Sequence, residues 1–252
     1  MRLKDRVAIV TGGGTGIGRA ISERFGREGA AVVVNYARSK EASEETARAI
    51  EATGGCAMAW QADVTREAEV RAMMAEVEAR WGRLDVLVNN AGWSTRIPHH
   101  QLEDLTDEIW DRTLDTNLRG AFYCVRAAVP LLKRQPGSSI VNMASSAAFH
   151  ASGSSIVYAA SKAAMVSMTK SLARALAPAI RVNAVCPGLV RTRFAGWPVE
   201  AFEHGQQVTP LGRLATVEEV AETALFLAAE ATGLTGEAII VDGGITQLGR
   251  SR

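Results

Sequence analysis

Residues 7–18 of this chain have the sequence VAIVTGGGTGIG. The first four are apolar, as in a strand of a parallel sheet that is buried on both faces. Five glycines follow between Gly12 and Gly18, and an amphipathic stretch begins at Ile17. Glycine lets backbone N–H groups come close to a ligand, because no Cβ stands in the way. A glycine-rich turn between a first strand and a helix is therefore typical of folds that hold a pyrophosphate at a helix N-terminus.

Short apolar runs alternate with longer amphipathic stretches along the rest of the chain. Further strands are predicted at residues 31–34, 56–59, 84–88, 139–143, 180–185 and 238–241, and helices at residues 17–28, 40–52, 66–81, 106–133, 157–177 and 217–227. Thr65 is a plausible N-cap, Thr216 and Glu219 have the spacing of a capping box, and Gly29 and Gly54 follow helix ends. Strand–helix alternation with short connections predicts right-handed βαβ units. The expected fold is α/β, with one doubly wound parallel sheet and helices on both of its faces.

Composition excludes several other classes of protein. The 252 residues include 28 Lys+Arg and 27 Asp+Glu, a net charge of +1, so no charge pattern indicates nucleic-acid binding. No stretch approaches 18 apolar residues, which argues against a membrane span. Cys56, Cys124 and Cys186 lie too far apart in sequence for a metal cluster, and no metal is predicted. We expect one domain over residues 1–252 in a cytoplasmic protein, with a substrate lid at residues 190–211, where an apolar insertion interrupts the alternation.

The end of the second predicted strand bears on the choice of cofactor. In folds that bind NAD, an acidic residue about 20 residues beyond the glycines contacts the ribose 2′-hydroxyl. Here no acid precedes Glu41, and Arg38 with Ser39 follows the strand instead. These side chains suit a 2′-phosphate, so NADP(H) is predicted over NAD(H). The alternative is that Arg38 and Lys40 are only solvated charges at a helix start, which leaves NAD(H) open.

Tyr158 and Lys162 form the principal catalytic candidate. Their i, i+4 spacing places both side chains on one face of a helix. A free tyrosine has a pKa near 10, and a neighbouring ammonium and a nicotinamide cation both favour its phenolate. Ser145 comes just after the apolar strand at residues 139–143, at the edge of the sheet where open α/β folds bind ligands. Asn117 lies mid-way along a long helical pattern, where an asparagine is ordinarily solvent-facing or bends the helix.

Taken in order, these motifs resemble the short-chain dehydrogenase/reductase family over about Arg6 to Gly244. They comprise T-G-x-x-x-G-x-G at 11–18, Asp63, N-N-A-G at 89–92, Asn117, Ser145, Y-x-x-x-K at 158–162, and Pro187-Gly188 followed by Thr192. The resemblance implies a Rossmann-type domain with a seven-stranded sheet. It also implies Tyr158 as general acid/base, Ser145 polarising the substrate oxygen, and Lys162 holding the nicotinamide ribose while lowering the Tyr158 pKa. Asn117 would hold a water that links Lys162 to solvent.

The same resemblance implies a cofactor-binding set, in which Asp63 and Val64 flank the adenine, Asn90 lies along the cofactor, and Thr192 contacts the nicotinamide end. The complete predicted set is Gly12, Thr15, Gly16, Ile17, Gly18, Arg38, Ser39, Asp63, Val64, Asn90, Ala91, Gly92, Tyr158, Lys162, Pro187, Gly188 and Thr192. Within the family, the chain is most similar to 3-oxoacyl-acyl-carrier-protein reductases and to glucose dehydrogenase-like members.

Candidate substrate contacts lie in loops expected at the same sheet edge: Trp93, His150, Leu189, Phe194 and Trp197. Aromatic walls suit a small or medium apolar carbonyl compound, although a loop tryptophan can also pack between subunits. Two long helices have more apolar surface than a sheet can cover, and with the resemblance this predicts a homotetramer.

The predicted function is NADP(H)-dependent hydride transfer between nicotinamide and a carbonyl or secondary alcohol. The alternatives are an NAD-dependent sugar or alcohol dehydrogenase of the same family, or a non-catalytic dinucleotide sensor. An enoyl reductase would show a longer Tyr–Lys spacing, which is absent from the sequence.

Overall fold

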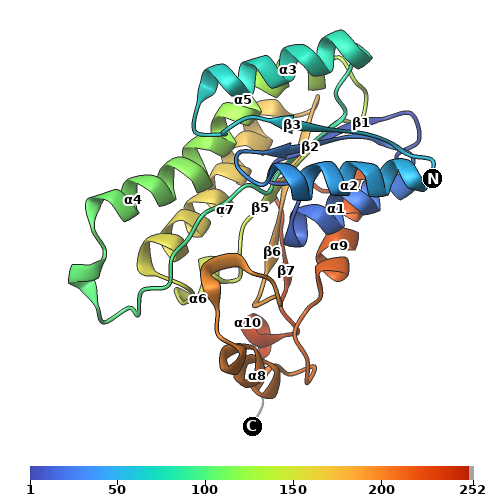
Figure 1. Ribbon diagram of the computed structural model, residues 1–252. Coiled ribbons are helices and arrows are strands. Elements are labelled where there is room, and N and C mark those ends of the chain that lie inside the picture. Colours follow the sequence, from blue (N-terminus) through green and yellow to red (C-terminus); the bar gives the residue numbers. More distant parts are fainter. Residues whose placement is uncertain (250–252) are drawn as a thin grey trace.

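The computed structural model describes residues 1–249, and residues 250–252 of the predicted single domain lie outside the described residues. Seven parallel strands form one sheet in the order β3-β2-β1-β4-β5-β6-β7 (Figure 1). The strands are β1 (Val7–Val10), β2 (Ala31–Tyr36), β3 (Cys56–Gln61), β4 (Val86–Asn89), β5 (Ser139–Met143), β6 (Arg181–Pro187) and β7 (Ala238–Val241). This is the predicted α/β fold with a doubly wound Rossmann-type sheet.

Alternate side chains of each strand enter two separate cores. Ala8 and Val10 of β1 pack with helices α1 (Gly16–Arg27), α2 (Lys40–Ala52) and α9 (Val217–Ala229) on one face. Val7 and Ile9 pack on the other face with α3 (Glu67–Trp81), α5 (Gly120–Leu132) and α7 (Ile156–Leu176). Figure 1 shows these two sets of helices on opposite sides of the sheet. Burial on both faces explains why these strands are nearly continuous apolar runs.

The strand order reverses between β1 and β4, which pair directly with each other. In open α/β sheets, ligands bind at this switch point, outside the carboxyl ends of the strands. The glycine-rich loop follows β1, and the N-N-A-G motif follows β4. The topology therefore places the two motifs side by side.

Several element ends differ from the predictions. The N-cap of α3 is Arg66 rather than Thr65, because Asp63 Oδ1 accepts hydrogen bonds from both the backbone and the hydroxyl of Thr65. The helix predicted at residues 106–133 comprises α4 (Asp107–Leu114), the π-helical turn η2 (Asp115–Arg119) and α5. The capping box of Thr216 and Glu219 is present at α9.

Short helical segments that the sequence patterns did not predict lie outside the sheet layers. Two of them, η3 (Phe194–Gly196) and α8 (Val199–Val208), fall within the predicted lid at residues 190–211. The others are η1 (Leu102–Asp104), α6 (Ala147–His150) and α10 (Ile245–Leu248). Among residues 1–249, no helix is both long and apolar enough to cross a membrane.

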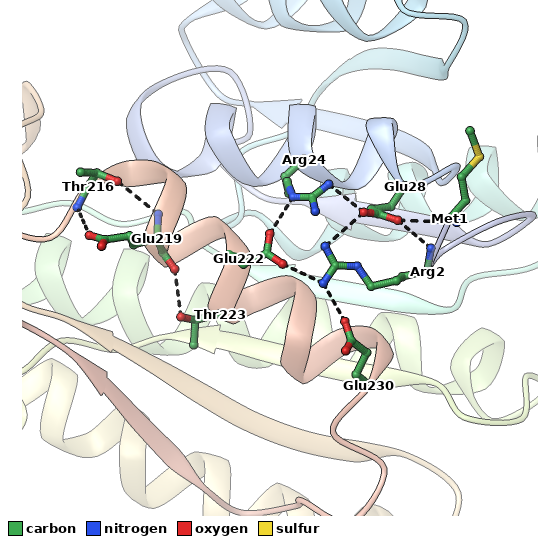
Figure 2. Close-up of polar contacts among 9 residues, drawn as sticks. All are labelled: Met1, Arg2, Arg24, Glu28, Thr216, Glu219, Glu222, Thr223 and Glu230. Atoms are coloured by element: carbon green, nitrogen blue, oxygen red, sulfur yellow. Dashed lines mark hydrogen bonds and ion pairs between the residues drawn. The ribbon is translucent and has the colours of Figure 1, made fainter.

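Ion pairs tie the N-terminal segment to α1 and α9 (Figure 2). Arg2 contacts Glu28 at 3.1 Å, and both Glu222 and Glu230 at 2.7 Å. Arg24 bridges Glu28 at 2.8 Å and Glu222 at 2.7 Å. Residues distant in sequence are thus joined beside the helices that cover one face of the sheet.

Candidate active site

The glycine-rich loop is held in place by buried polar side chains. Thr11 Oγ1 accepts hydrogen bonds from the backbone N–H groups of Asn90 and Ala91, each at 2.9 Å. The Asn90 amide in turn donates to the carbonyl oxygens of Thr11 at 2.9 Å and Gly12 at 3.1 Å. Asn35 of β2 accepts from the Gly12 N–H at 3.4 Å and donates to the Ala62 carbonyl at 2.9 Å. These bonds hold the glycine-rich loop against the ends of β2 and β4.

The conformation of this loop suits a dinucleotide pyrophosphate. Gly12 and Gly16 have positive φ angles of 61° and 51°, a region that favours glycine. A Cβ on Gly18 would collide with the Gly12 carbonyl oxygen, so the tight turn requires glycine there as well. The N–H groups of Gly16 and Ile17 open helix α1 and donate to no acceptor within residues 1–249. Such free N–H groups at a helix N-terminus are well placed to bind phosphate oxygens.

The ends of β2 and β3 form the wall next to this loop. Arg38 and Ser39 are exposed and line the cleft, and Arg38 makes no ion pair with the described residues. Ser39 is the N-cap of α2 but makes no side-chain capping bond. Asp63 and Val64 line the same cleft, where Asp63 accepts a 2.8 Å bond from the Thr65 hydroxyl. These side chains are thus available to an adenosine end of a ligand.

Tyr158 and Lys162 lie at the start of α7, as their spacing predicts. Ser155 caps this helix by accepting a 3.3 Å bond from the Tyr158 N–H. The Lys162 ammonium lies 5.6 Å from the centroid of the Tyr158 ring and donates a 2.7 Å bond to the carbonyl of Met143. Both side chains thus face the carboxyl end of β5, where Ser145 also lies.

Burial changes the acidity of this pair. It raises the pKa of Tyr158 to about 12, an effect that a hydrogen bond to the neighbouring Ser145 side chain partly offsets. Burial also lowers the pKa of Lys162 to about 8. Removing a charged group from water disfavours its charged form, which explains both directions. In this structure the Tyr158 pKa is therefore raised, opposite in direction to the lowering that the family resemblance implies.

Asn117 is fully buried, not solvent-facing as an asparagine in a helical pattern ordinarily is. It lies in the π-helical turn η2, where its Oδ1 accepts from the Trp93 N–H at 2.7 Å. Its Nδ2 donates to the Trp93 carbonyl at 3.0 Å and to the Ser161 hydroxyl at 3.1 Å. A Cβ built on Gly92 would lie 3.4 Å from Asn117 Oδ1 and 3.9 Å from Lys162 Nζ. Asn117 therefore links the loop after β4 to the helix that holds Tyr158 and Lys162.

Aromatic and polar side chains surround Tyr158. The Phe194 ring lies 5.8 Å from the Tyr158 ring, centroid to centroid. The Ser145 hydroxyl donates to the Pro187 carbonyl at 3.3 Å. His150 lies between two serines, with Nδ1 2.7 Å from Ser152 Oγ and Nε2 3.2 Å from Ser146 Oγ. Aromatic side chains and serine hydroxyls therefore both line this part of the cleft.

A single cleft of about 1150 Å³ contains nearly the whole predicted site. Every predicted cofactor and substrate residue lines it, including Pro187, Gly188, Leu189, Thr192 and Trp197, and of the predicted catalytic residues only Asn117 lies behind its wall. The patterns did not indicate Asn35, the Met143 carbonyl or Arg112. The first two act through contacts between distant strands and helices, which no local spacing reveals.

Comparisons with known proteins agree with this geometry. A family model described as enoyl-(acyl carrier protein) reductase matches residues 12–246. A ketoacyl reductase ascribed to the granaticin polyketide synthase of Streptomyces violaceoruber is 43% identical over 241 residues, which are 94% of this chain and 95% of that protein. This chain belongs to the short-chain dehydrogenase/reductase family. The protein is therefore an oxidoreductase.

Further relatives match this chain over nearly their whole length, and two solved structures share its fold. The 3-oxoacyl-[acyl-carrier-protein] reductase FabG of Staphylococcus aureus is 40% identical over 242 residues, 94% of this chain and 97% of FabG. A doubly substituted family member from Serratia marcescens superimposes with a TM-score of 0.89 at 36% identity, covering 98% of this chain and 100% of that one. A Brucella melitensis structure titled as a glucose/ribitol dehydrogenase gives 0.87 at 35% identity, covering 97% and 98%.

Proposed function

We propose that this protein transfers a hydride between NADP(H) and a carbonyl or secondary alcohol substrate. The observation behind the proposal is the position of Tyr158, which lies beside Ser145 and Lys162 in the same cleft as the glycine-rich loop. A nicotinamide cofactor, when bound, supplies the hydride for reduction or takes it up in oxidation. NAD-dependent oxidation of a sugar or another alcohol is the second candidate, and the name of the Brucella structure, a glucose/ribitol dehydrogenase, favours the alcohol substrate.

The side chains divide the proton chemistry among them. The Tyr158 hydroxyl donates its proton to the carbonyl oxygen during reduction, and in the reverse direction the phenolate accepts it. The Ser145 hydroxyl turns from the Pro187 carbonyl to donate to the same substrate oxygen. The Lys162 ammonium favours the phenolate and holds the ribose of the cofactor. Asn117 holds a water that connects Lys162 to solvent.

The other residues of the cleft bind and position the cofactor. Gly12, Thr15, Gly16, Ile17 and Gly18 approach the pyrophosphate, and Arg38 with Ser39 contacts the 2′-phosphate of NADP(H). Asp63 and Val64 flank the adenine, and Asn90, Ala91 and Gly92 follow the chain of the cofactor. Pro187, Gly188 and Thr192 contact the nicotinamide end, below a lid at residues 190–211.

We further propose that the protein is a cytoplasmic homotetramer. Trp110 of α4 and Phe122 of α5 are 37% and 40% exposed, so the α4–α5 segment presents two large aromatic side chains to water. Burial against a second copy of the same helices would remove both from water. A monomer by light scattering would contradict this assembly.

Removal of the Tyr158 hydroxyl tests the proposed activity. Tyr158→Phe is expected to abolish most NADPH-dependent reduction of a carbonyl panel that includes 3-oxo esters, the class suggested by the relatives' names. NADPH binding, followed by fluorescence, should be unchanged because the ring remains. Tyr123→Phe is the matched control, since that ring lies on α5 beside Arg126 and outside the cleft. Full activity of Tyr158→Phe would refute the proposed role.

A further inference from the structure

An unpaired arginine lies at the substrate end of the cleft. Arg112 of α4 is half-buried, and its guanidinium carbon lies 4.3 Å from the centroid of the Trp93 ring. Its side chain makes no hydrogen bond or ion pair with residues 1–249, although Glu108 lies one turn earlier on α4. Stacking on an aromatic face holds the guanidinium flat and leaves the N–H groups at its edge free.

The position of Arg112 along the continuous helix formed by α4, η2 and α5 shows which end of the cleft it lies at. Gly120 packs against Val64, the predicted adenine contact, since a Cβ there would lie 2.8 Å from Val64 Cγ2. Asn117 lies near Lys162, also close to Gly92. Arg112 precedes Asn117 by five residues, which is about 7.5 Å along a helix. Arg112 is therefore on the far side of Lys162 from the adenine end.

Trp93 gives this arginine a fixed position. Both the N–H and the carbonyl of Trp93 are bonded to the Asn117 side chain, at 2.7 and 3.0 Å. Trp93 also follows directly after Gly92, which lies close to the Lys162 ammonium. The stacked pair is thus attached to the loop that passes Lys162, and it lines the same cleft as Tyr158.

The charges around the cleft are almost all positive. Among the described residues that line it, Asp63 is the one acid, and it lies at the predicted adenine end. Of the other arginines that line it, Arg19 is paired with Glu23 and Glu45, and the exposed Arg191 lies 5.0 Å over the ring of Phe202 in α8. Arg112 differs from these in being half-buried, without an ion pair among the described residues, and stacked on Trp93, which directly follows Gly92.

We propose that Arg112 binds the carboxylate of the substrate, and that the protein acts on oxo acids or the corresponding hydroxy acids. This inference rests on the proposed function, because it names the substrate class of that site. A carboxylate accepts two parallel N–H bonds from one guanidinium, which fixes both its position and its orientation. The aromatic walls then contact the carbon chain between the carboxylate and the reacting carbonyl.

Matched acids and esters test the proposal by turnover. The substrates are 4-oxopentanoate and 6-oxoheptanoate with their methyl esters, each with NADPH. The native enzyme is expected to prefer the acids, and Arg112→Met should lower kcat/KM for the acids by about 10- to 100-fold, mainly through KM. The esters should change little, and Arg112→Lys should restore part of the loss. An equal acid-to-ester ratio in native enzyme and Arg112→Met would overturn the proposal.

Arg80→Met is the matched control. Arg80 lies 5.3 Å over the ring of Trp81 at the end of α3, outside the cleft. The substitution therefore removes a stacked arginine of the same kind without changing the cleft. It should leave the acid-to-ester ratio unchanged.

Binding separates this inference from the proposed function. Calorimetry with the protein saturated with NADP+ measures affinity for the same oxo acids without turnover. Acid-selective binding that Arg112→Met abolishes, with no reduction of any panel member, would support the carboxylate site and refute the proposed activity. Reduction of the panel without a preference for acids would support the proposed activity and refute the carboxylate site. Failure of every acid to bind would overturn the inference.

Discussion

The ammonium of Lys162 donates a 2.7 Å hydrogen bond to the main-chain carbonyl of Met143, the last residue of β5. The preceding residue, Asn142, donates to Thr169 at 2.9 Å, two turns further along α7. Strand β5 therefore holds α7 at two points on the same helix face. This double contact fixes the height of Tyr158 above the end of the sheet.

Burial of this lysine makes a distinct prediction for stability. Its pKa is about 8 in the folded protein against an ordinary 10.5. Between these values the unfolded chain binds more protons, so the free energy of unfolding rises with pH. We expect the native protein to gain about 2 kcal/mol from this group between pH 7 and pH 9.5. Urea unfolding of Lys162→Met at the two pH values should lack that gain.

Lys170→Met is the control for this measurement, because Lys170 lies on the same helix and is exposed. It should keep the pH dependence of the native protein. If the unfolding free energy of Lys162→Met depended on pH as that of the native protein does, the Lys162 pKa would be at its ordinary value in the folded protein.

Gly18→Ala should damage the glycine loop. The new Cβ would collide with the Gly12 carbonyl and lie 2.5 Å from Asn90 Nδ2. We expect a loss of about 1–3 kcal/mol in unfolding free energy, as in other overpacked sites. Affinity for NADP+, measured by calorimetry, should fall at least about tenfold.

Gly233→Ala is the comparison, because no heavy atom lies within 4 Å of its Cβ position. It should retain native affinity. Unchanged NADP+ binding by Gly18→Ala would show that the loop does not cradle the cofactor.

The fold and most of the cleft lining could be predicted because they depend on local patterns. Apolar runs such as 7–10 and 139–143 coincide with strands at the same residues. The family motifs likewise lie where the topology brings strand ends together. Strand β2 continues to Tyr36, two residues beyond its predicted end, because Asn35 is buried through bonds that a polarity pattern does not reveal.

What could not be predicted depends on contacts between distant segments. The apolar pattern at residues 106–133 indicates one long helix and leaves Asn117 as either solvent-facing or helix-bending. In the structure Asn117 lies buried in a π-helical turn, bonded to Trp93 and Ser161. Arg112 looked like any charged residue on a helix. Its importance comes from Trp93, which follows a different strand and meets it only in the folded chain.

Arg38 is expected to select the cofactor. An exposed arginine with no ion pair can make charge-assisted hydrogen bonds to a 2′-phosphate, each worth about 1.5–3 kcal/mol. Arg38→Leu should therefore lower kcat/KM with NADPH by about 10- to 100-fold and leave the value with NADH nearly unchanged. Arg48→Leu, an exposed position on α2, should alter neither value. Equal use of both cofactors by the native enzyme would contradict the NADP(H) assignment.

Glu28 should contribute stability that is lost in acid. The Arg2 backbone N–H, then the Arg2 and Arg24 side chains, lower its pKa from 4.5 to about 2 (Figure 2). A lowered pKa stabilises the fold above pH 4.5, and this contribution disappears as the pH falls towards 2. At pH 7 we expect Glu28→Gln to reduce the unfolding free energy by about 1–2 kcal/mol, after allowance for solvent screening.

The difference between Glu28→Gln and the native protein should shrink at pH 3, because the native carboxylate is then closer to protonation. Glu23→Gln tests whether the loss of any ion pair on α1 reduces the unfolding free energy by the same amount. Glu23 contacts Arg19 and Arg27 of its own helix, so its loss should cost only about 0.5 kcal/mol. Glu28 instead joins Arg2 of the N-terminal segment to Arg24 of α1, and both arginines also contact Glu222 of α9. Equal losses for the two variants at pH 7 would show that this cross-linking adds nothing to an ordinary helical pair.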